Sequence, residues 1–469
     1  MKLKETDNYD KSRQLQIEDC LQENKLEIEC IVEVPSNISG TFKGINDQIT
    51  IQSGMLEEMI SNNNMNMAYK RVKANKGSHG VDGMKIDELL AYLIQNGDQI
   101  KQEILSGTYN PQAIKRVEIP KENGKKRKLG IPVVVDRVIQ QAIAQILTPI
   151  YENKFSENSY GFRPNKSAHQ AIKKCEEYIN AGYKWAVDID LAQFFDKVNH
   201  DKLIQIMSKD IKDGRVLSLI SKYLKAKVSI NGKLEESLLG TPQGGNISPL
   251  LSNIMLNELD VELTKRELHF VRYADDCNIY VKTKKAAERV MKSITEFIEE
   301  KLLLEVNKEK SKIDRPWKLK FLGISFYYSN NGVKIRLHEK SLIKFKKKLR
   351  EITSRSNGMS IEQKVEKLRQ CIIGWVNYFK IADMKNIVQE LDRWLRRRIR
   401  MCYWKNWKKI KTKHDNLVRL GIPEYKAWEY ANTSKNYWRI SNSPILSKTL
   451  TNKYLENIGL ISIKSCYCK

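Results

Sequence analysis

The sequence predicts a mixed α+β body that is followed by a helical and strongly basic region. Between about residues 55 and 335, apolar residues alternate between helical and strand spacing, which is typical of α/β or α+β domains. Beyond about residue 338 the spacing is helical, and residues 340–411 contain 21 basic and 6 acidic residues. Since 469 residues are too many for one hydrophobic core, we expect roughly two to four domains.

The N-terminal part of the chain shows little periodicity at first. Residues 1–50 are polar, with one short strand pattern at residues 29–34, and we expect an extension outside the main domain. Helical spacing then runs through residues 55–60 and 68–72 and ends at the glycine-rich turn of residues 76–83.

Residues 116–132 predict two strands that are joined by a turn at Asn123 and Gly124. The hairpin is rich in cations. Lysines on an exposed edge strand protect it against pairing with other chains, but a basic hairpin can also grip the triphosphate of a nucleotide. The residues by themselves favour the exposed edge strand.

Two acidic segments follow in the α+β body. Helical patterns at residues 136–149 and 168–180, with a loop at residues 159–165, lead to the β-forming segment 185–196. Residues 270–281 consist of two apolar β-forming runs around a tight Asp-Asp turn, which predicts a hairpin.

Asp190, Asp275 and Asp276 are the chemically most informative residues of these two segments. Carboxylates that gather at one point repel each other unless cations neutralise them. Two divalent ions about 3.5–4 Å apart would do so and would drive in-line phosphoryl transfer. Mg²⁺ suits such a site, with Mn²⁺ as a substitute. Asp188 lies two residues before Asp190 on the same strand face and is the alternative to it.

Residues 240–260 predict a loop rich in proline and glycine and then a helix from Ser248. Two glycines at this junction let the backbone approach a base pair or a phosphate closely, and Gln243 offers an amide to a template strand. A turn that caps a core helix explains the helix but not the Gln-Gly-Gly run. Further on, the lysines of residues 304–312 are explained by an exposed lysine run or by protonation of a leaving pyrophosphate.

The formal net charge is +26 and the pI is near 9.5, which indicates a polyanionic partner. No apolar run reaches the ~18 residues of a membrane span, and the first residues lack the apolar core of a signal peptide. Nucleic acid is therefore the expected partner, and no membrane is. The eight cysteines are scattered without zinc-finger spacing, which fits a reducing cytosol.

Aromatic residues are interleaved with the cations of the helical region. Such a mixture suits a groove that follows a phosphate backbone, but aromatics at three-to-four spacing are also typical of a buried helix face. We expect the aromatics to face inward and an arginine cluster to face outward and bind nucleic acid. The cluster comprises Arg393, Arg396, Arg397, Arg398 and Arg400.

The order of the motifs makes a resemblance to one known family specific. The chain resembles a bacterial group II intron-encoded reverse transcriptase/maturase of the compact class-C type over about residues 55–469. The motifs similar to the reverse-transcriptase blocks are Arg127 with residues 130–132, and residues 160–164, 190–200, 241–245, 273–276 and 321–323. Residues 374–379 (GWVNYF) resemble the thumb of that family.

The resemblance implies a fold and a domain order. The expected fold is an α+β right-hand polymerase of fingers and palm, followed by an all-α thumb/maturase region. The expected domains are an N-terminal extension (1–50), fingers and palm (51–335), the helical thumb/maturase region (336–425) and a small basic DNA-binding-like segment (426–469).

The resemblance also implies site residues. Asp190, Asp275 and Asp276 would be the catalytic ligands of two Mg²⁺ ions, with Asp190 as the first acid of the family pattern. Phe195 would be the gate against a ribose 2′-hydroxyl. The expected nucleotide- and template-binding residues are Arg127, Lys121, Phe195, Gln243, Gly244 and Lys310.

The function that the resemblance implies is that of an RNA-directed DNA polymerase. Such proteins bind their host group II intron RNA, assist its splicing and copy it into DNA during retrohoming. The implied partners are the intron RNA, an RNA template with a DNA primer or target, and deoxynucleoside triphosphates. The implied location is the bacterial cytoplasm, near the nucleoid.

Two departures and three alternatives accompany this expectation. The N-terminal extension has no counterpart in the family pattern, and the last histidine is His414, so we expect no HNH endonuclease after the thumb. A stand-alone reverse transcriptase of the retron or defence type is disfavoured by the maturase-like thumb. A splicing cofactor with a vestigial polymerase is disfavoured by the full set of acids, and an RNA-dependent RNA polymerase is disfavoured by Phe195.

Overall fold

The computed structural model describes residues 54–120, 126–237, 239–330 and 332–468. The chain divides into two compact units, the first ending at Arg315 and the second beginning at Pro316. This boundary comes earlier than the expected end of the fingers and palm at residue 335. The expected strand at residues 29–34, the turn at Asn123 and Gly124, and Lys121 lie outside the described residues.

Several helices of the first unit begin at side-chain caps that the sequence supplies. Ser167 and Gln170 form a capping box at the start of α7 (Ala168–Asn180), whose bounds agree with the prediction. α6 (Val134–Glu152) continues past its expected end, because Pro149 stands in the last turn, where its missing N–H removes a single bond. The other helices are α3 (Met55–Met59), α4 (Asn62–Ala74), α5 (Leu89–Leu105), α8 (Phe194–Lys197), α9 (His200–Ser208), α10 (Gly214–Leu224), α11 (Ser248–Lys265) and α12 (Lys284–Lys301).

Both predicted hairpins of the first unit are confirmed, and each lies in its own four-stranded sheet. The basic hairpin lies in the sheet of order β2-β1-β4-β5, which consists of β1 (Ile114–Pro120), β2 (Lys126–Ile131), β4 (Val228–Ile230) and β5 (Lys233–Glu235). The two acidic segments meet in the sheet of order β6-β7-β3-β8, which consists of β3 (Trp185–Ile189), β6 (His269–Tyr273), β7 (Asp276–Val281) and β8 (Lys312–Asp314).

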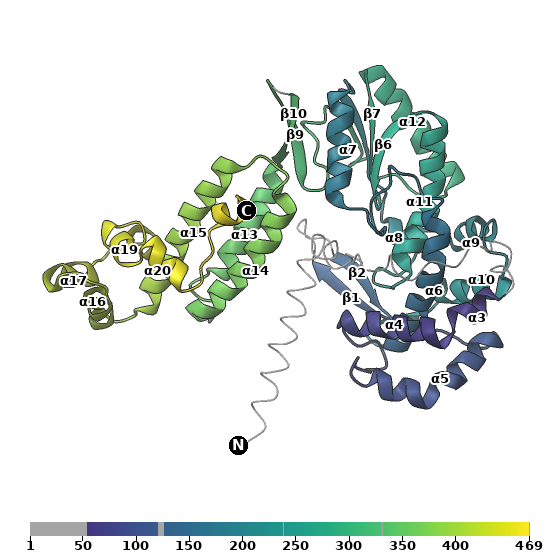
Figure 1. Ribbon diagram of the computed structural model, residues 1–469, viewed down its shortest axis with the longest axis horizontal. Helices are drawn as coiled ribbons and strands as arrows, with labels where there is room; N and C mark the ends of the chain where they lie inside the picture. The colour runs from purple at the N-terminus through teal and green to yellow at the C-terminus, as the bar shows by residue number, and fades with distance from the viewer. Residues whose placement is uncertain (1–53, 121–125, 238, 331, 469) are drawn as a thin grey trace. The chain divides into compact units, whose positions relative to one another are not determined.

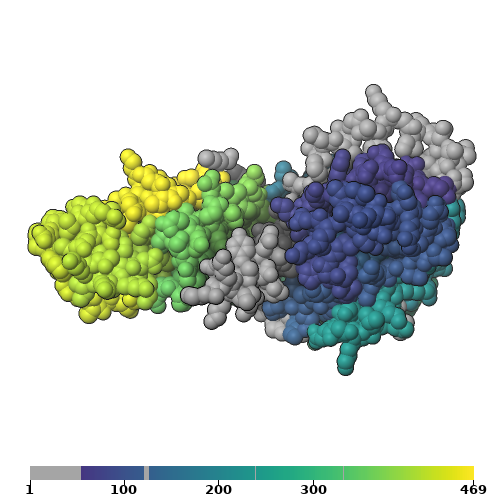
Figure 2. Space-filling view, turned by 90° about the horizontal axis from the view of Figure 1, so that it is seen from below, coloured from purple at the N-terminus to yellow at the C-terminus, as the bar shows by residue number. Residues whose placement is uncertain are grey.

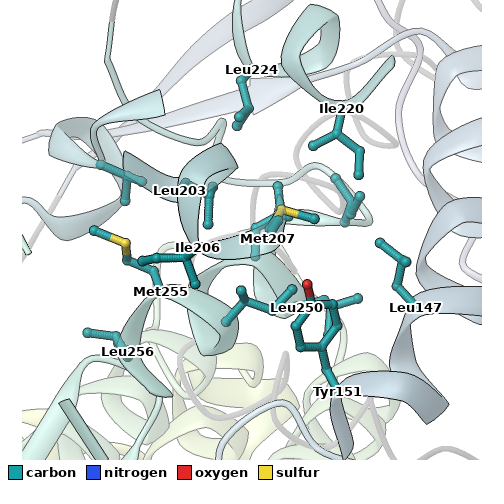
Figure 3. Packing of buried hydrophobic residues seen from close by; sticks show 14 of the residues in the cluster. Leu147, Tyr151, Leu203, Ile206, Met207, Ile220, Leu224, Leu250, Met255 and Leu256 are labelled. Atoms are coloured by element: carbon teal, nitrogen blue, oxygen red, sulfur yellow. The ribbon is translucent and has the colours of Figure 1, made fainter. Parts of the chain in front are cut away.

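Helices pack around the β6-β7-β3-β8 sheet and against each other. α7 lies along β6, and α12 lies along β3 and β7 (Figure 1). Apolar side chains of α6, α9, α10 and α11 converge on one core, among them Leu147, Met207, Ile220, Leu250 and Met255 (Figure 3). Figure 2 shows the purple and blue surface that the N-terminal helices α3 to α5 form on this unit.

The second unit is a short hairpin followed by helices. β9 (Ile324–Ser329) and β10 (Gly332–Leu337) pair antiparallel, and α13, α14 and α15 follow side by side (Figure 1). The Phe345 and Trp375 rings stack with their centroids 4.0 Å apart, which joins α13 to α14. The helices are α13 (Glu339–Ile352), α14 (Ile361–Phe379), α15 (Lys385–Asn406), α16 (Ile410–Arg419), α17 (Glu424–Ala431), α18 (Tyr437–Ile440), α19 (Pro444–Thr449), α20 (Asn452–Asn457) and α21 (Ile463–Tyr467).

The helices of both units differ from membrane-spanning helices in their length or hydropathy. Within the described ranges, none of the helices combines the length and the apolar character that crossing a bilayer requires.

Candidate active site

The β6-β7-β3-β8 sheet brings the predicted acids together. In the antiparallel pairing of β3 with β7, Ile189 lies opposite Cys277, and both belong to the core. The next step of this register sets Asp190 opposite Asp276. Because successive side chains of a strand alternate between its faces, Asp188, Asp190 and Asp276 share the face opposite to that of the core residues.

The pKa of Asp188 indicates that the carboxylates on this face lie close together. Burial, followed by the nearby carboxylates of Asp276 and Asp190, raises the pKa of Asp188 to about 7, against a smaller lowering by Lys312. A buried carboxyl whose ionisation is hindered by two neighbouring carboxylates marks a place that a cation stabilises.

The side chain of Lys310 lies against the carboxylate of Asp190 on this sheet face. Its Nζ lies 3.1 and 3.2 Å from Oδ1 and Oδ2 of Asp190. The backbone N–H of Asp190 donates to Ser311 Oγ at 3.0 Å, and its carbonyl accepts from the N–H of Asn307 at 2.8 Å. The segment before β8 therefore fixes both the backbone and the carboxylate of Asp190.

The turn that carries Asp275 and Asp276 has a left-handed residue before it. Ala274 has a φ of 54°, a conformation that costs an alanine about 1–2 kcal/mol. Arg272 Nη1 donates to the Ala274 carbonyl at 3.0 Å and holds this conformation. Gly161 lies against the same turn, where an added Cβ would stand 2.3 Å from the Ala274 nitrogen.

A buried ion pair anchors Arg272 in turn. Its Nε and Nη2 donate to the two carboxylate oxygens of Asp260 at 2.7 and 2.5 Å, and neither side chain is exposed. Asn253 accepts from Arg272 Nη1 at 2.9 Å and donates to the Gly161 carbonyl at 2.8 Å. α11 therefore positions the acidic turn through the bidentate ion pair between Asp260 and Arg272.

The predicted nucleotide-binding residues meet although they are far apart in sequence. Arg127 Nε donates to Gln243 Oε1 at 2.8 Å. The Gln243 carbonyl accepts from the Gly130 N–H at 2.7 Å. Gly244 has a φ of 117°, and an added Cβ would stand 2.5 Å from the Gly130 carbonyl oxygen. The glycine is thus required by a close backbone approach and by its φ.

Phe195 lies beside the same loop. Its side chain is half-buried and meets the Phe194 ring edge-on at 5.2 Å. Its carbonyl accepts from the N–H of Thr241 at 2.6 Å, and an added Cβ on Gly240 would stand 2.6 Å from that carbonyl oxygen. The Gly-Thr-Pro-Gln-Gly-Gly loop is therefore fixed to both the Phe195 backbone and the basic hairpin.

The carboxylate oxygens at this face suit Mg²⁺ or Mn²⁺. Within the described part of the chain, no three His, Cys, Asp or Glu side chains form a ready-made metal cage. Mg²⁺ needs none, because it binds through one or two carboxylates and completes its coordination with water and substrate phosphates. The crowded acids and the ammonium group at Asp190 show that the place accommodates positive charge, so its residues fit divalent ions.

The expectation that the arginine cluster of α15 faces outward is wrong for most of its members. Arg393 is exposed, but Arg396, Arg397, Arg398 and Arg400 are only half-exposed. Arg397 Nη2 donates to the Trp438 carbonyl at 2.8 Å, and Arg400 Nε donates to the Leu450 carbonyl at 3.0 Å. Long guanidinium side chains reach and satisfy helix-end carbonyls, which their spacing in sequence does not reveal. The inward aromatics are confirmed for Trp375, Tyr378, Phe379, Trp404 and Trp407.

Sequence reasoning missed the residues that hold the acidic turn. Arg272 was part of an apolar strand pattern, and Asp260 and Asn253 were part of a helix pattern. A charged residue inside each pattern was the available signal, because a buried charge needs a buried partner.

Two protein families match the chain. A family described as reverse transcriptase (RNA-dependent DNA polymerase) matches residues 119–326, and one described as group II intron, maturase-specific domain, matches residues 342–421. The first match contains the three predicted catalytic acids. The second match contains α14, α15 and α16.

Curated relatives agree with these matches. Protein YkfC of Escherichia coli is 36% identical over 280 residues, which cover 51% of this chain and 74% of that protein. The group II intron-encoded protein LtrA of Lactococcus lactis is 39% identical over 207 residues, or 44% of this chain and 34% of that protein. The mitochondrial nuclear intron maturase 2 of Arabidopsis thaliana is 28% identical over 203 residues, or 35% of this chain and 28% of that protein. The chain thus matches only about a third of the length of the last two.

A solved structure, titled a partial Cas6-RT-Cas1–Cas2 complex, covers 53% of this chain and 43% of its own, with a TM-score of 0.34 and 20% identity. This similarity is too distant to inform function.

Proposed function

The chain belongs to the family of group II intron-encoded reverse transcriptase/maturases, and on that premise we propose that it copies RNA into DNA, binds its host intron RNA, assists its splicing and copies it during retrohoming. The observation that carries the proposal is the meeting of Asp188, Asp190 and Asp276 on one sheet face. Carboxylates that crowd on one sheet face suit metal-dependent nucleotidyl transfer.

The chemistry proposed here is two-metal nucleotidyl transfer. Two Mg²⁺ ions bound by Asp190, Asp275 and Asp276 would neutralise the triphosphate and favour attack by the primer 3′-hydroxyl. Arg127, which Gln243 holds by a hydrogen bond, binds the triphosphate of the incoming deoxynucleotide. Lys310 Nζ lies beside Asp190, and Lys310 would donate a proton to the leaving pyrophosphate.

Other residues select the substrate. The half-buried ring of Phe195 excludes a ribose 2′-hydroxyl by steric overlap, which favours deoxynucleotides. Gln243 and Gly244 line the pocket for the template base. Because Gly244 has no Cβ, its backbone lies close to the Gly130 carbonyl. Lys121 is assigned to the triphosphate by its place in the family pattern.

The domains are assigned on the same premise. Residues 51–335 form the fingers and palm, residues 336–425 form the thumb and maturase region that binds the intron RNA, and residues 426–469 form a small basic segment that contacts DNA. Because such a protein would act on intron RNA and on a DNA target, we infer that it works in the bacterial cytoplasm, associated with the nucleoid.

Primer extension tests the proposal directly. The full chain is incubated with an RNA template, an annealed DNA primer, deoxynucleotides and Mg²⁺. We expect full-length DNA that depends on the divalent ion and is lost with chelator. Binding of the primer–template without any extension would refute the polymerase and leave a splicing cofactor with a vestigial polymerase.

Splicing is tested separately. The host intron, transcribed with its flanking exons, should splice at lower Mg²⁺ when the chain is present. Extension activity without any effect on splicing would identify the chain as a stand-alone reverse transcriptase.

A further inference from the structure

The second unit contains a basic pocket that the catalytic residues do not use. Its volume is about 520 Å³, and it lies where the loop between α13 and α14 meets α15 and α18. Its lining residues are Arg350, Ser354, Arg355, Ser356, Arg398, Met401, Lys405 and Trp438. Four of these are cations, and none of the described residues that line it is acidic.

Aromatic rings hold three of the cations. The Arg350 guanidinium lies 5.7 Å from the centre of the Trp394 ring, and Arg355 and Lys405 lie 4.9 and 5.3 Å from the centre of the Tyr437 ring. A cation held over a ring keeps its N–H donors available to another group. In the part of the chain that the structure describes, none of the three side chains has a carboxylate partner or donates a hydrogen bond.

Arg398 also lines the pocket. Its Nε donates to Thr353 Oγ1 at 2.5 Å, and its Nη2 lies 3.3 Å from the carbonyls of Arg350 and Thr353, at the C-terminal end of α13. Burial lowers the pKa of Arg398, and the neighbouring Arg350 and Arg355 lower it as well. The cations are thus close enough to repel each other, and an anion between them would relieve that repulsion.

The remaining lining residues complete a site for a nucleotide. Ser354 and Ser356 present hydroxyls 3.3 Å apart, which can donate to phosphate oxygens. Trp438 is 36% exposed, and the Arg397 guanidinium lies over its ring at 3.9 Å from the ring centre. An aromatic side chain beside a cationic groove is the usual platform for an unpaired base. The volume falls in the range of pockets that enclose small organic ligands, so it admits more than a phosphate group.

We propose that this pocket binds one unpaired nucleotide of an RNA chain, with its phosphate among Arg350, Arg355 and Lys405 and its base against Trp438. The inference rests on the proposed function, because that function supplies the RNA. A nucleotide within a duplex stays stacked on its neighbours and cannot enter the pocket. The pocket therefore recognises a single-stranded or bulged position of the RNA.

The test compares two substitutions that introduce a carboxylate. Ser356→Glu places a carboxylate among the pocket cations at an exposed position, so it leaves the fold intact. Thr412→Glu adds the same charge at an exposed position of α16 outside the pocket. The affinity of the full chain for a short unstructured RNA is measured by fluorescence anisotropy. We expect Ser356→Glu to weaken binding roughly tenfold, as the loss of a charged hydrogen bond would, and Thr412→Glu to weaken it less than about threefold.

A second pair of variants removes cations instead. Arg355→Gln with Lys405→Gln should weaken RNA binding roughly tenfold or more, whereas Arg369→Gln with Lys385→Gln, at exposed positions outside the pocket, should not. Trp438→Ala should weaken binding to single-stranded RNA and leave binding to a blunt RNA duplex unchanged. Equal losses in the pocket and control variants, or equal losses on single strand and duplex, would overturn the proposal.

The outcome separates this inference from the proposed function. Primer extension at saturating primer–template is measured on the same variants, and the pocket variants should extend at the wild-type rate. Wild-type protein that extends primers while the pocket variants bind RNA normally would reject the pocket alone. Wild-type protein that neither extends primers nor binds RNA would reject the proposed function.

Discussion

Asp276 shares a sheet face with Asp188 and Asp190, and the carboxylates of Asp276 and Asp190 are close enough to raise the pKa of Asp188. Replacing Asp275 or Asp276 with Asn removes a metal ligand that we assign to the transition state. Since metal stabilisation of the transition state is worth several kcal/mol, primer extension should fall by at least about a hundredfold. RNA affinity should change little, because the basic surface supplies it. Steady-state primer extension checks the predicted loss of activity, and fluorescence anisotropy with RNA on the same preparations checks the unchanged affinity.

Asp188 and Asp190 provide the internal control for that prediction. Asp190→Asn should be as severe as Asp276→Asn, and Asp188→Asn should be milder, because burial favours the neutral form of Asp188. The reverse ranking would make Asp188 the metal ligand and leave Asp190 with the pairing to Lys310 as its role.

Phe195→Ala should relax the choice of sugar. Truncating the ring removes the overlap with a 2′-hydroxyl, so ribonucleotide incorporation should rise by about tenfold or more relative to deoxynucleotide incorporation. Competition between ribo- and deoxynucleotides in primer extension measures the ratio. Phe194→Leu serves as a control, because Phe194 is buried in the core next to the gate. An unchanged ratio in Phe195→Ala would place the gate elsewhere.

At the scale of elements, the loop that contains Gly161 sets the position of the acidic turn. An added Cβ would stand 2.3 Å from the Ala274 nitrogen, so Gly161→Ala must displace the loop or the turn. We expect a loss of about 1–3 kcal/mol in the free energy of unfolding and a larger proportional loss of extension rate. Gly97→Ala is the matched control, because nothing lies within 4 Å of its added Cβ in α5. Chemical unfolding and extension rates measured together test this, and unimpaired extension would show that the turn does not depend on the loop.

His200 connects α9 to the Gly-Thr-Pro-Gln-Gly-Gly loop of residues 240–245. Its Nε2 lies 2.7 Å from the Gly240 carbonyl, and burial lowers its pKa below the ordinary 6.5. The unfolded chain therefore takes up the proton first as the pH falls, so this histidine makes the folded state less stable below about pH 6.5 than above it. His200→Gln should reduce that dependence, and His79→Gln, at an exposed position, should not. Denaturant unfolding below and above this pH measures the difference, and identical pH profiles of wild type and His200→Gln would contradict it.

The sequence predicts helices and strands better than it predicts the side-chain contacts that join them. The bounds of α7 and both hairpins follow from local spacing and from a capping box, which act within a few residues. The contact of Arg127 with Gln243 and that of Lys310 with Asp190 join residues more than 100 positions apart, and only the family resemblance anticipated that they would meet. The Arg272–Asp260 pair was not anticipated, because local patterns do not state which buried charge meets which.

At the scale of the whole molecule, the cationic side chains of the two units have different kinds of partner. Several surface cations of the first unit have carboxylate partners, such as Lys154 with Asp210 at 2.6 Å. Arg350, Arg355 and Lys405 in the second unit are held by aromatic rings instead. After all acidic residues are counted, a net charge of +26 remains, and it favours binding to a polyanion.

The last prediction follows from that charge. Each phosphate that the chain neutralises releases counterions, so the logarithm of the RNA binding constant should fall linearly with the logarithm of salt concentration, with a slope of about −0.7 per contact on a single strand. If the chain engages about five phosphates or more, the slope is about −3.5 or steeper. Asp276→Asn should lie on a line parallel to that of wild type, because a metal ligand contributes to chemistry rather than to the phosphate contacts. A wild-type slope shallower than about −1 would mean that the excess cations stay solvated and that RNA is held by other contacts.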